Sequence, residues 1–284
     1  MTDGDRRKTD DEREAASDDL EKDAIRERVW DDLEESGTAR FPFPPHGRIP
    51  NFEGAKTAAD RLADQPEWID ADAIKANPDA PQLPVRRRAL REGKTVYMAV
   101  PRLRDEDCFL RLDPDELEDY DAATTVSGSS SHGVQVGPEQ LERIDLVVSG
   151  SVAVSAPAGG NRSDGEAPAS GTRSDGETGD RTAAAGGGRI GKGEGYSDLE
   201  YAILRDLELV DDETTVATTV HERQLIDADV ELADHDVPMD LIVTPDRVLR
   251  PDRDDTPDGI DWDLLKDDRL DEIPVLKRLD ERRG

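Results

Sequence analysis

The stretch Gly186-Gly-Gly-Arg-Ile-Gly-Lys-Gly-Glu-Gly-Tyr-Ser-Asp198 is the most informative segment of this chain. Its glycines lack Cβ atoms, so the backbone can approach a phosphate closely and point its N–H groups at it. Residues 199–207 read as a helix, which would place a bound anion at a helix N-terminus. Asp198 is placed to help hold the Mg²⁺ that accompanies a nucleoside triphosphate. The alternative is a glycine-rich turn without a ligand, because the spacing matches neither a P-loop nor a dinucleotide fingerprint.

The charge of the chain is extreme. Its 284 residues include 37 Lys and Arg against 68 Asp and Glu, a formal net charge of −31. Only 8 of the basic residues are lysines, and the acidic residues are spread along the whole chain. Such a surface repels itself unless salt screens it, so we predict adaptation to high salt. The charge also argues against a nucleic-acid partner, which requires a basic face.

The single cysteine, Cys108, excludes an internal disulfide framework and fits a reducing compartment. It lies beside carboxylates in Asp105-Glu-Asp-Cys108, which would raise its pKa, so we interpret it as structural and not nucleophilic. No apolar run is long enough to span a membrane, and the N-terminus is charged instead of signal-like. We therefore expect a cytoplasmic protein without a membrane partner.

Helix and strand patterns alternate along most of the chain. Apolar spacing predicts helices over 20–33, 54–62, 66–76, 85–92 and 198–207, and apolar runs predict buried strands over 95–100, 144–149, 214–220 and 241–244. Three prolines in the segment 41–47 must end the first helix. Strands separated by helix-length segments imply an α/β fold with a mostly parallel sheet that is covered on both faces.

Composition divides the chain into parts. Residues 1–18 are charged and lack apolar periodicity, so we expect them to be disordered. Residues 19–250 form the α/β domain, with a low-complexity insertion over 157–186 in which Arg-Ser-Asp-Gly-Glu occurs twice. Residues 251–284 form a C-terminal extension, and we expect its apolar residues to pack back on the domain.

Two cations on the first helix are candidate partners of the glycine loop. Lys22 and Arg26 are four residues apart, so both project from one face of the helix. They repel each other unless an anion, such as a triphosphate, lies between them. The alternative is an exposed pair whose repulsion is relieved by the neighbouring Glu21, Asp23 and Glu27.

In this order, these segments resemble the 5-formyltetrahydrofolate cyclo-ligase family. That family has a Lys-x-x-x-Arg helix, here Lys22-Asp-Ala-Ile-Arg26, and an Arg-Leu-Gly-x-Gly-x-Gly-Tyr-Tyr-Asp loop, here Arg189 to Asp198. The segment His235-Asp-Val-Pro-Met-Asp-Leu-Ile-Val-Thr244 resembles the family's closing motif and final strand. The resemblance covers roughly residues 20–250. It implies a three-layer α/β/α fold of the sugar-isomerase and CoA-transferase type.

The resemblance also implies a reaction. ATP would phosphorylate the formyl oxygen of 5-formyltetrahydrofolate, N10 of the same substrate would attack, and phosphate would leave as 5,10-methenyltetrahydrofolate forms. No protein nucleophile is needed, so the protein would act by positioning and charge neutralisation.

Site residues follow from the same resemblance. Arg189 and Lys192 would be catalytic, Asp198 would bind Mg²⁺, and Asp79 and Gln82 would lie near the reduced folate. ATP would be bound by Lys22, Arg26, Gly188, Arg189, Ile190, Gly191, Lys192, Gly193, Glu194, Gly195 and Tyr196. Residue by residue there are alternatives: Tyr196 could pack the loop on the sheet, and Asp79 and Gln82 could form the first turn of a helix.

Two residues of the loop depart from the family pattern. Ser197 replaces the second tyrosine, which removes an aromatic wall, and Glu194 puts a negative charge inside the phosphate loop. These departures motivate a rival interpretation, a non-enzymatic protein on the same fold that binds a nucleotide or acts as an interaction module.

Overall fold

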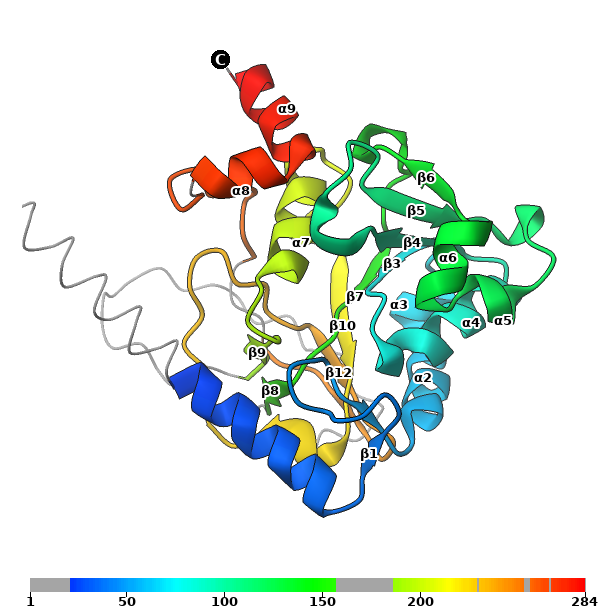
Figure 1. The fold of residues 1–284 in the computed structure, drawn as a ribbon. Helices are drawn as coiled ribbons and strands as arrows, with labels where there is room; N and C mark the ends of the chain where they lie inside the picture. The colour runs from blue at the N-terminus through cyan, green and yellow to red at the C-terminus, as the bar shows by residue number, and fades with distance from the viewer. Residues whose placement is uncertain (1–20, 157–185, 229, 253–255, 266, 284) are drawn as a thin grey trace, which may run out of the picture.

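A central eight-stranded sheet organises the protein (Figure 1). The computed structural model describes residues 21–156, 186–228, 230–252, 256–265 and 267–283. Across the sheet the strands follow one another as β13 (Val248–Leu249), β12 (Leu241–Val243), β10 (Thr215–Thr219), β7 (Leu146–Val148), β3 (Ala73–Ala76), β4 (Thr95–Ala99), β5 (Phe109–Leu112) and β6 (Val134–Val136). The strands expected over 95–100, 144–149, 214–220 and 241–244 are confirmed.

The five middle strands of this sheet, β12 to β4, are parallel, and the remaining three add to its edges in antiparallel fashion. In chain order the parallel strands are β3, β4, β7, β10 and β12, so the chain builds outward from β3 in one direction and then reverses. The reversal lies between β3 and β7, and such a switch point opens a crevice at the carboxyl ends of the strands.

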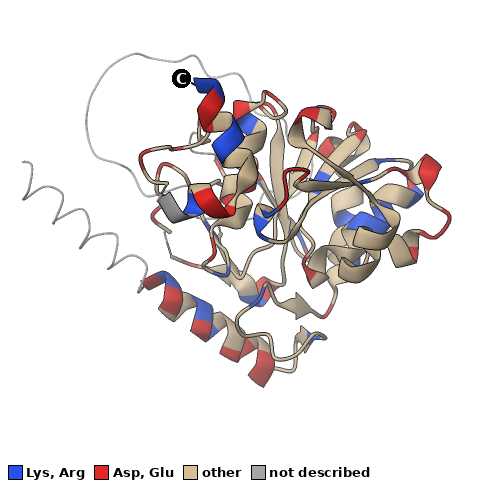
Figure 2. Cartoon of the chain, turned by 45° about the horizontal axis from the view of Figure 1, so that its top comes forward, with Lys and Arg blue, Asp and Glu red and all other residues tan. Residues whose placement is uncertain are grey.

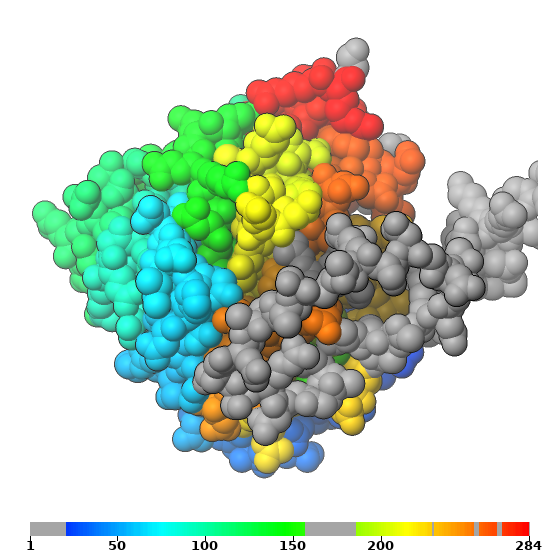
Figure 3. Space-filling view, turned by 180° about the vertical axis from the view of Figure 1, so that it is seen from behind, coloured from blue at the N-terminus to red at the C-terminus, as the bar shows by residue number. Residues whose placement is uncertain are grey.

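Helices cover both faces of the sheet, as an α/β fold requires (Figure 1). One layer contains α2 (Ala55–Ala63), α3 (Pro66–Ile69) and α4 (Leu83–Arg91), with α5 (Tyr120–Ala123) and α6 (Val126–His132) beside it. The opposite side carries α7 (Tyr196–Asp206). Seen from behind, the α2–α4 region forms a continuous cyan face (Figure 3). The structure therefore bears out the expected α/β class with a mostly parallel sheet.

The helix expected over 66–76 is wrong in its second half. The helix α3 ends at Ile69, and residues 73–76 form β3, a completely buried strand between β4 and β7. The short sequence Ala-Ile-Lys-Ala has no strong strand preference of its own, so pairing with two neighbouring strands decides its conformation. The other helices expected between residues 54 and 207 are present.

The first helix covers residues 21–35 and packs with a small second sheet. That sheet contains β11 (Leu225–Ile226), β8 (Ala153–Ser155) and β9 (Arg189–Ile190), while β1 (Ala39–Arg40) pairs with β2 (Asn51–Phe52) in a ribbon. Strands β8 and β9 are antiparallel, and they flank the insertion predicted over 157–186. Residues 157–185, like residues 1–18, lie outside the described part of the chain.

The C-terminal extension docks at one end of the molecule beside α7 (Figures 1 and 3). It contains α8 (Asp267–Glu272) and α9 (Pro274–Arg283). Ile273, Val275 and Leu276 of this segment are fully buried in the main hydrophobic core. Most of the apolar residues described in this segment therefore pack on the domain, whereas Leu264 is 57% exposed.

Acidic residues occur on helices and loops in many parts of the ribbon (Figure 2). Cys108, immediately before β5, is buried, and its burial raises the pKa of the thiol to about 12, which suits a structural residue. Within the described residues, no helix combines the length and the apolar character needed to cross a membrane.

Candidate functional site

The glycine loop runs from the end of β9 to the start of α7. Gly193 and Gly195 have φ values of +94° and +67°, which side chains other than glycine rarely adopt. Gly195 is the residue that precedes the first turn of α7, and no side chain caps that turn. The backbone N–H groups at the start of α7 are therefore available to an anion, and the helix dipole favours negative charge there.

The N-terminal helix meets this loop from outside. Arg26 is buried and its Nε donates to the carbonyl oxygen of Gly191 at 2.8 Å, across 165 residues of sequence. A Cβ on Gly193 would lie only 3.6 Å from the Arg26 guanidinium carbon. Lys22 lies one turn earlier and its Nζ is 3.2 Å from a carboxylate oxygen of Asp236. Arg26 Nη1 also pairs with Asp23 at 2.5 Å, as the alternative interpretation expects. The structure thus brings Arg26 to the loop and Lys22 to the segment that follows β11, with the charge of Arg26 partly neutralised on its own helix.

Arg189 and Asp198 form a buried ion pair that closes the base of the loop. Arg189 Nη2 lies 2.7 and 2.5 Å from the two carboxylate oxygens of Asp198, and its Nη1 donates to Gly150 O at 3.0 Å. Burial alone would lower the pKa of Arg189, but the charge and hydrogen bonds of Asp198 outweigh it, so the pKa is raised. Arg189 is therefore a permanent cation beneath the loop.

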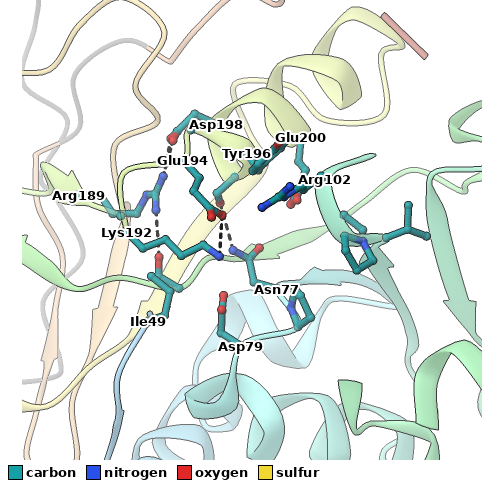
Figure 4. Close-up of a pocket in the computed structure, with 18 residues that line it drawn as sticks. Ile49, Asn77, Asp79, Arg102, Arg189, Lys192, Glu194, Tyr196, Asp198 and Glu200 are labelled. Carbon is teal, nitrogen blue, oxygen red and sulfur yellow. Dashed lines mark hydrogen bonds and ion pairs between the residues drawn. The ribbon is translucent and has the colours of Figure 1, made fainter. Parts of the chain in front are cut away.

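A cavity of about 310 Å³ opens between the glycine loop and the carboxyl ends of β3, β4 and β7 (Figure 4). Asn77 follows β3, Val100 to Arg102 follow β4, and Gly150 follows β7, so three adjacent strands supply one wall. The loop and the first turn of α7 supply the other wall. This is the edge at which ligands bind in open parallel sheets.

The floor of the cavity is polar. The Asn77 Oδ1 accepts from Lys75 Nζ at 2.6 Å, and its Nδ2 is 3.3 Å from Ser197 Oγ, which lies 3.2 Å from Ser149 Oγ. Lys75, from the middle of β3, forms a buried ion pair with Glu200 of α7. Buried polar groups in a connected network fix their own positions, so this floor presents a rigid hydrogen-bonding surface.

Asp79 lies below Asn77 with its carboxylate turned into the cavity (Figure 4). Burial raises its pKa, although the charges of Lys192 and Arg86 act in the opposite direction. Arg86 is buried behind this turn and donates to the carbonyl groups of Asn77, Pro78, Asp79 and Thr124. Burial lowers the pKa of Arg86 to about 10, which still leaves it charged at neutral pH.

Arg102 is a cavity residue that the sequence analysis did not select. It reaches from the end of β4 toward α7, where Tyr196 and Glu200 lie (Figure 4). Arg102 and Leu103 have φ values of 60° and 51°. Each such residue costs about 1–3 kcal/mol, and strain of this kind collects at functional sites. Its only sequence signal is a proline at the end of a buried strand, which also occurs at ordinary turns.

Lys192, the loop's own lysine, is paired with the loop's own acid. Lys192 Nζ lies 2.7 Å from Glu194 Oε2, and both side chains remain more than one third exposed. The pair is therefore weak and easily exchanged for another anion. Glu194 neutralises in part the cation that would meet a phosphate.

The predicted residues thus fall into two groups. Eight of them line the cavity: Asp79, Arg189, Gly191, Lys192, Glu194, Gly195, Tyr196 and Asp198. The other six do not line it. Lys22 and Arg26 belong to the first helix, where Arg26 contacts the loop at Gly191, and Gly193 is an exposed residue of the loop. Gly188 is held by Ser155 through an N–H to Oγ bond of 2.9 Å, Ile190 is buried in β9, and Gln82 is buried beside Thr219, at 3.5 Å. Gln82 remains a prediction without a contact to the cavity, while Asn77 and Arg102 are lining residues that sequence reasoning missed.

The loop suits an anion better than a metal ion. Glycine backbone, Lys192 and the N-terminus of α7 surround one side of the cavity, which suits an anion. Both oxygens of Asp198 already accept from Arg189, so an ion would have to share them. Among the residues that the structure describes, no group of three or more His, Cys, Asp or Glu could hold a metal. The metal role of Asp198 stays a prediction.

Comparison with known proteins gives a consistent set of relatives. The 5-formyltetrahydrofolate cyclo-ligase family model matches residues 18–164 and 183–245. The methenyltetrahydrofolate synthase domain-containing protein of Mus musculus is 38% identical over 272 residues, which cover 93% of this chain and 64% of the relative. The protein of the same description from Homo sapiens is 34% identical over 269 residues, with 92% and 61% covered.

The matches cover only part of the curated relatives, and the solved structure is less similar in sequence. The chain spans less than two thirds of the length of both curated relatives. The NMR structure of Aquifex aeolicus 5,10-methenyltetrahydrofolate synthetase is similar at 17% identity and a TM-score of 0.46, with 83% of this chain and 95% of that one covered.

Proposed function

Because this chain belongs to the 5-formyltetrahydrofolate cyclo-ligase family, we propose that it converts 5-formyltetrahydrofolate to 5,10-methenyltetrahydrofolate with ATP, releasing ADP and phosphate. The observation that carries this proposal is the contact between two distant segments, the Arg26 side chain and the Gly191 carbonyl, at 2.8 Å. A loop with bare backbone, backed by a buried arginine, has the chemistry needed to hold a triphosphate.

Each part of the loop has a separate task in this proposal. The N–H groups at the start of α7 donate hydrogen bonds to phosphate oxygens, and Lys192 exchanges its weak pairing with Glu194 for the γ-phosphate. Arg26 and Arg189 stay in place, since both hold backbone carbonyl groups as well as carrying charge. Their positive charges lower the energy of the negative charge that spreads over the transferred phosphoryl group.

The folate would lie in the same cavity, against the carboxyl ends of β3 and β4. In the proposed reaction the formyl oxygen attacks the γ-phosphorus and ADP leaves. N10 of the same molecule then attacks the formyl carbon and loses its proton to water, and the carbon–oxygen bond breaks to release phosphate. Asn77 and Ser197 offer hydrogen bonds to a heterocyclic ring, and Asp79 lies opposite them. Holding the formyl oxygen in line with the γ-phosphate is the main contribution that the protein has to make.

We propose that the reaction takes place in the cytoplasm. In this proposal Mg²⁺ is the ion that ATP carries into the site. A nucleotide-bound Mg²⁺ needs only one or two carboxylates, because phosphate oxygens and water complete its coordination. Asp198, in the first turn of α7, is the carboxylate proposed for this ion, and it would serve only by sharing its oxygens with Arg189.

A second candidate function is nucleotide binding without turnover. The ion pair between Lys192 and Glu194 favours it, because an acid inside the phosphate loop weakens the cation that should stabilise the transition state. The two candidates share the loop and differ in whether the folate is consumed.

One assay separates them. Purified protein in molar KCl is given ATP, Mg²⁺ and 5-formyltetrahydrofolate, and the absorbance of methenyltetrahydrofolate is followed. Under the same conditions ATP binding is measured by calorimetry. Turnover supports the ligase, while ATP binding with no turnover by folded protein leaves the second candidate. Failure of both would refute the assignment of the loop as a nucleotide site.

A further inference from the structure

The C-terminal extension reaches back to the glycine loop. Arg269 of α8 donates from Nη2 to the carbonyl oxygen of Glu194 at 3.0 Å, and its guanidinium carbon lies 4.7 Å from the centroid of the Tyr196 ring. The segment that matches the family model ends at residue 245. A side chain from outside the matched segment therefore contacts both Glu194 and Tyr196, which belong to the loop that we propose to bind ATP.

The bond to Glu194 fixes more than one carbonyl group. A trans peptide unit is planar, with its C=O and N–H directed to opposite sides. When the Glu194 carbonyl faces Arg269, the N–H of Gly195 must face away from Arg269. Gly195 lines the cavity and precedes the first turn of α7, whereas Arg269 is not among the cavity residues. Arg269 thus sets the direction of an N–H group at the position where an anion would bind.

The stacking contact of Arg269 restrains Tyr196, the residue that follows Gly195. Tyr196 is the first residue of α7 and lines the cavity. A guanidinium over an aromatic face attracts it and restricts its rotation. One arginine therefore holds both the last peptide unit of the loop and the first side chain of the helix.

Arg269 is presented by a firmly docked segment. Ile273, Val275 and Leu276 are fully buried, and Arg278 of α9 lies 3.0 Å from Glu139. Between α7 and the extension, the Asp206 carboxylate accepts from the N–H of Ile260 at 3.2 Å. The position of Arg269 is therefore determined by packing that does not involve the loop.

We propose that Arg269 is a positioning residue for the phosphate loop, through the Glu194 carbonyl and the Tyr196 ring. Arg26 donates a hydrogen bond to the Gly191 carbonyl near the N-terminal end of the loop. Arg269 donates one to the Glu194 carbonyl near its C-terminal end. This inference rests on the proposed function only for the identity of the bound anion, which we take to be ATP. The control of loop geometry by Arg269 holds with or without a ligand.

Hydrogen–deuterium exchange on the ligand-free protein tests the loop geometry directly. Arg269→Ala is compared with Arg283→Ala, a matched control because Arg283 stacks on Trp262 at the same 4.7 Å within the extension. Amides of residues 192–197 should exchange faster in Arg269→Ala, by about three- to tenfold, and remain unchanged in Arg283→Ala. Unchanged exchange in Arg269→Ala would overturn the proposal even if ATP binds normally.

A second variant covers the case in which Arg269→Ala loosens the whole extension. Tyr196→Leu keeps the arginine and the buried residues 273–276 but removes the stacking partner. The proposal requires faster loop exchange in Tyr196→Leu with unchanged protection of residues 273–279, and the double variant should add less than the sum of the two single effects. Additive effects would show that Arg269 and Tyr196 act separately and would contradict it.

Ligand binding gives the independent readout. The Kd for ATP should rise about three- to tenfold in Arg269→Ala and be largely restored in Arg269→Lys, while the KM for the folate stays within twofold. If wild-type protein binds no ATP, the proposed function fails, and the exchange experiment still decides the role of Arg269. If ATP binds and Arg269→Ala leaves its Kd and the exchange unchanged, only the present inference fails.

Discussion

Arg189 and Asp198 are joined through a single guanidinium nitrogen, Nη2, which lies 2.7 and 2.5 Å from the two carboxylate oxygens. Their side chains are 6% and 12% exposed, so neither charge is well solvated. The pair connects β9, before the loop, to the first turn of α7, after it. The shape of the loop therefore depends on a charge pair between its two ends.

Asp198→Asn should lower the free energy of unfolding by about 3 kcal/mol, because it leaves the charge of Arg189 buried without compensation. Urea denaturation at fixed KCl concentration measures this. The double variant Arg189→Met with Asp198→Leu should regain most of the stability without regaining ATP binding. A change below about 0.5 kcal/mol in Asp198→Asn would contradict the structural role of the pair.

Arg26→Ala should weaken ATP binding about tenfold, since the substitution removes a buried charge and the hydrogen bond that orients Gly191. Calorimetric titration with ATP measures the change. Arg28→Ala is the matched control, because Arg28 is an exposed residue of the same helix. Equal affinities in the two variants would show that the first helix does not take part in the nucleotide site.

Asp79→Asn should stabilise the protein at neutral pH. Burial raises the pKa of Asp79 above that of the unfolded chain, so the folded state binds this proton more tightly. The stability that the protonated group contributes is complete below the unfolded pKa and is lost as the pH rises through the folded pKa. Each unit of that pKa difference corresponds to about 1.4 kcal/mol at higher pH.

Thermal unfolding of wild type and Asp79→Asn between pH 4 and pH 8 tests this sign. The gap in Tm should favour the variant at pH 7 and close toward pH 4. Glu118→Gln, a substitution of an exposed carboxylate, should show no such gap. A wild type that is more stable than Asp79→Asn at pH 7 would mean that the carboxylate is stabilised by its neighbours Lys192 and Arg86.

Stability should increase strongly with salt. With a formal net charge of −31, self-repulsion is long-ranged at 0.1 M salt, where the screening length is about 10 Å, and short-ranged at 1 M, where it is about 3 Å. We expect Tm to rise by about 10 °C or more between 0.1 and 2 M KCl. Sucrose at matched osmolality should give a smaller rise. Equal effects of the two solutes would point to solvent exclusion instead of charge screening.

The sequence was sufficient for those elements whose signal is local. The strand at β4 is an apolar run between Gly93 and Pro101, and α7 follows a loop of alternating glycines, so both could be predicted. Strand β3 could not, because its four residues include Lys75, a charged side chain that normally indicates exposure. The carboxylate of Glu200, brought from α7 by the fold, and the side-chain oxygen of Asn77 together make the burial of Lys75 tolerable.

The candidate site shows the same division. The glycine loop and Arg26 were found because the motif is contiguous and the helix spacing is regular. Asn77 and Arg102 were missed because their importance comes from standing at the carboxyl ends of neighbouring strands. That neighbourhood depends on the order of strands in the sheet, in particular on β3 lying between β4 and β7. The contact of Arg269 with Tyr196 joins residues 73 positions apart and carries no local signal.

The hairpin formed by β8 and β9 has a consequence for engineering the chain. Ser155 N–H donates to Gly188 O at 2.8 Å and Gly187 N–H donates to Ser155 O at 2.9 Å, so the two ends of the segment 157–185 are fastened together before the chain enters the glycine loop. The cost of closing a loop grows only by about 0.6 kcal/mol for each doubling of its length. Exchanging this segment for a short turn, or for an inserted reporter domain, would therefore leave the register of Arg189 unchanged. The length of the segment 157–185 can therefore be changed without changing the residues that form the candidate site.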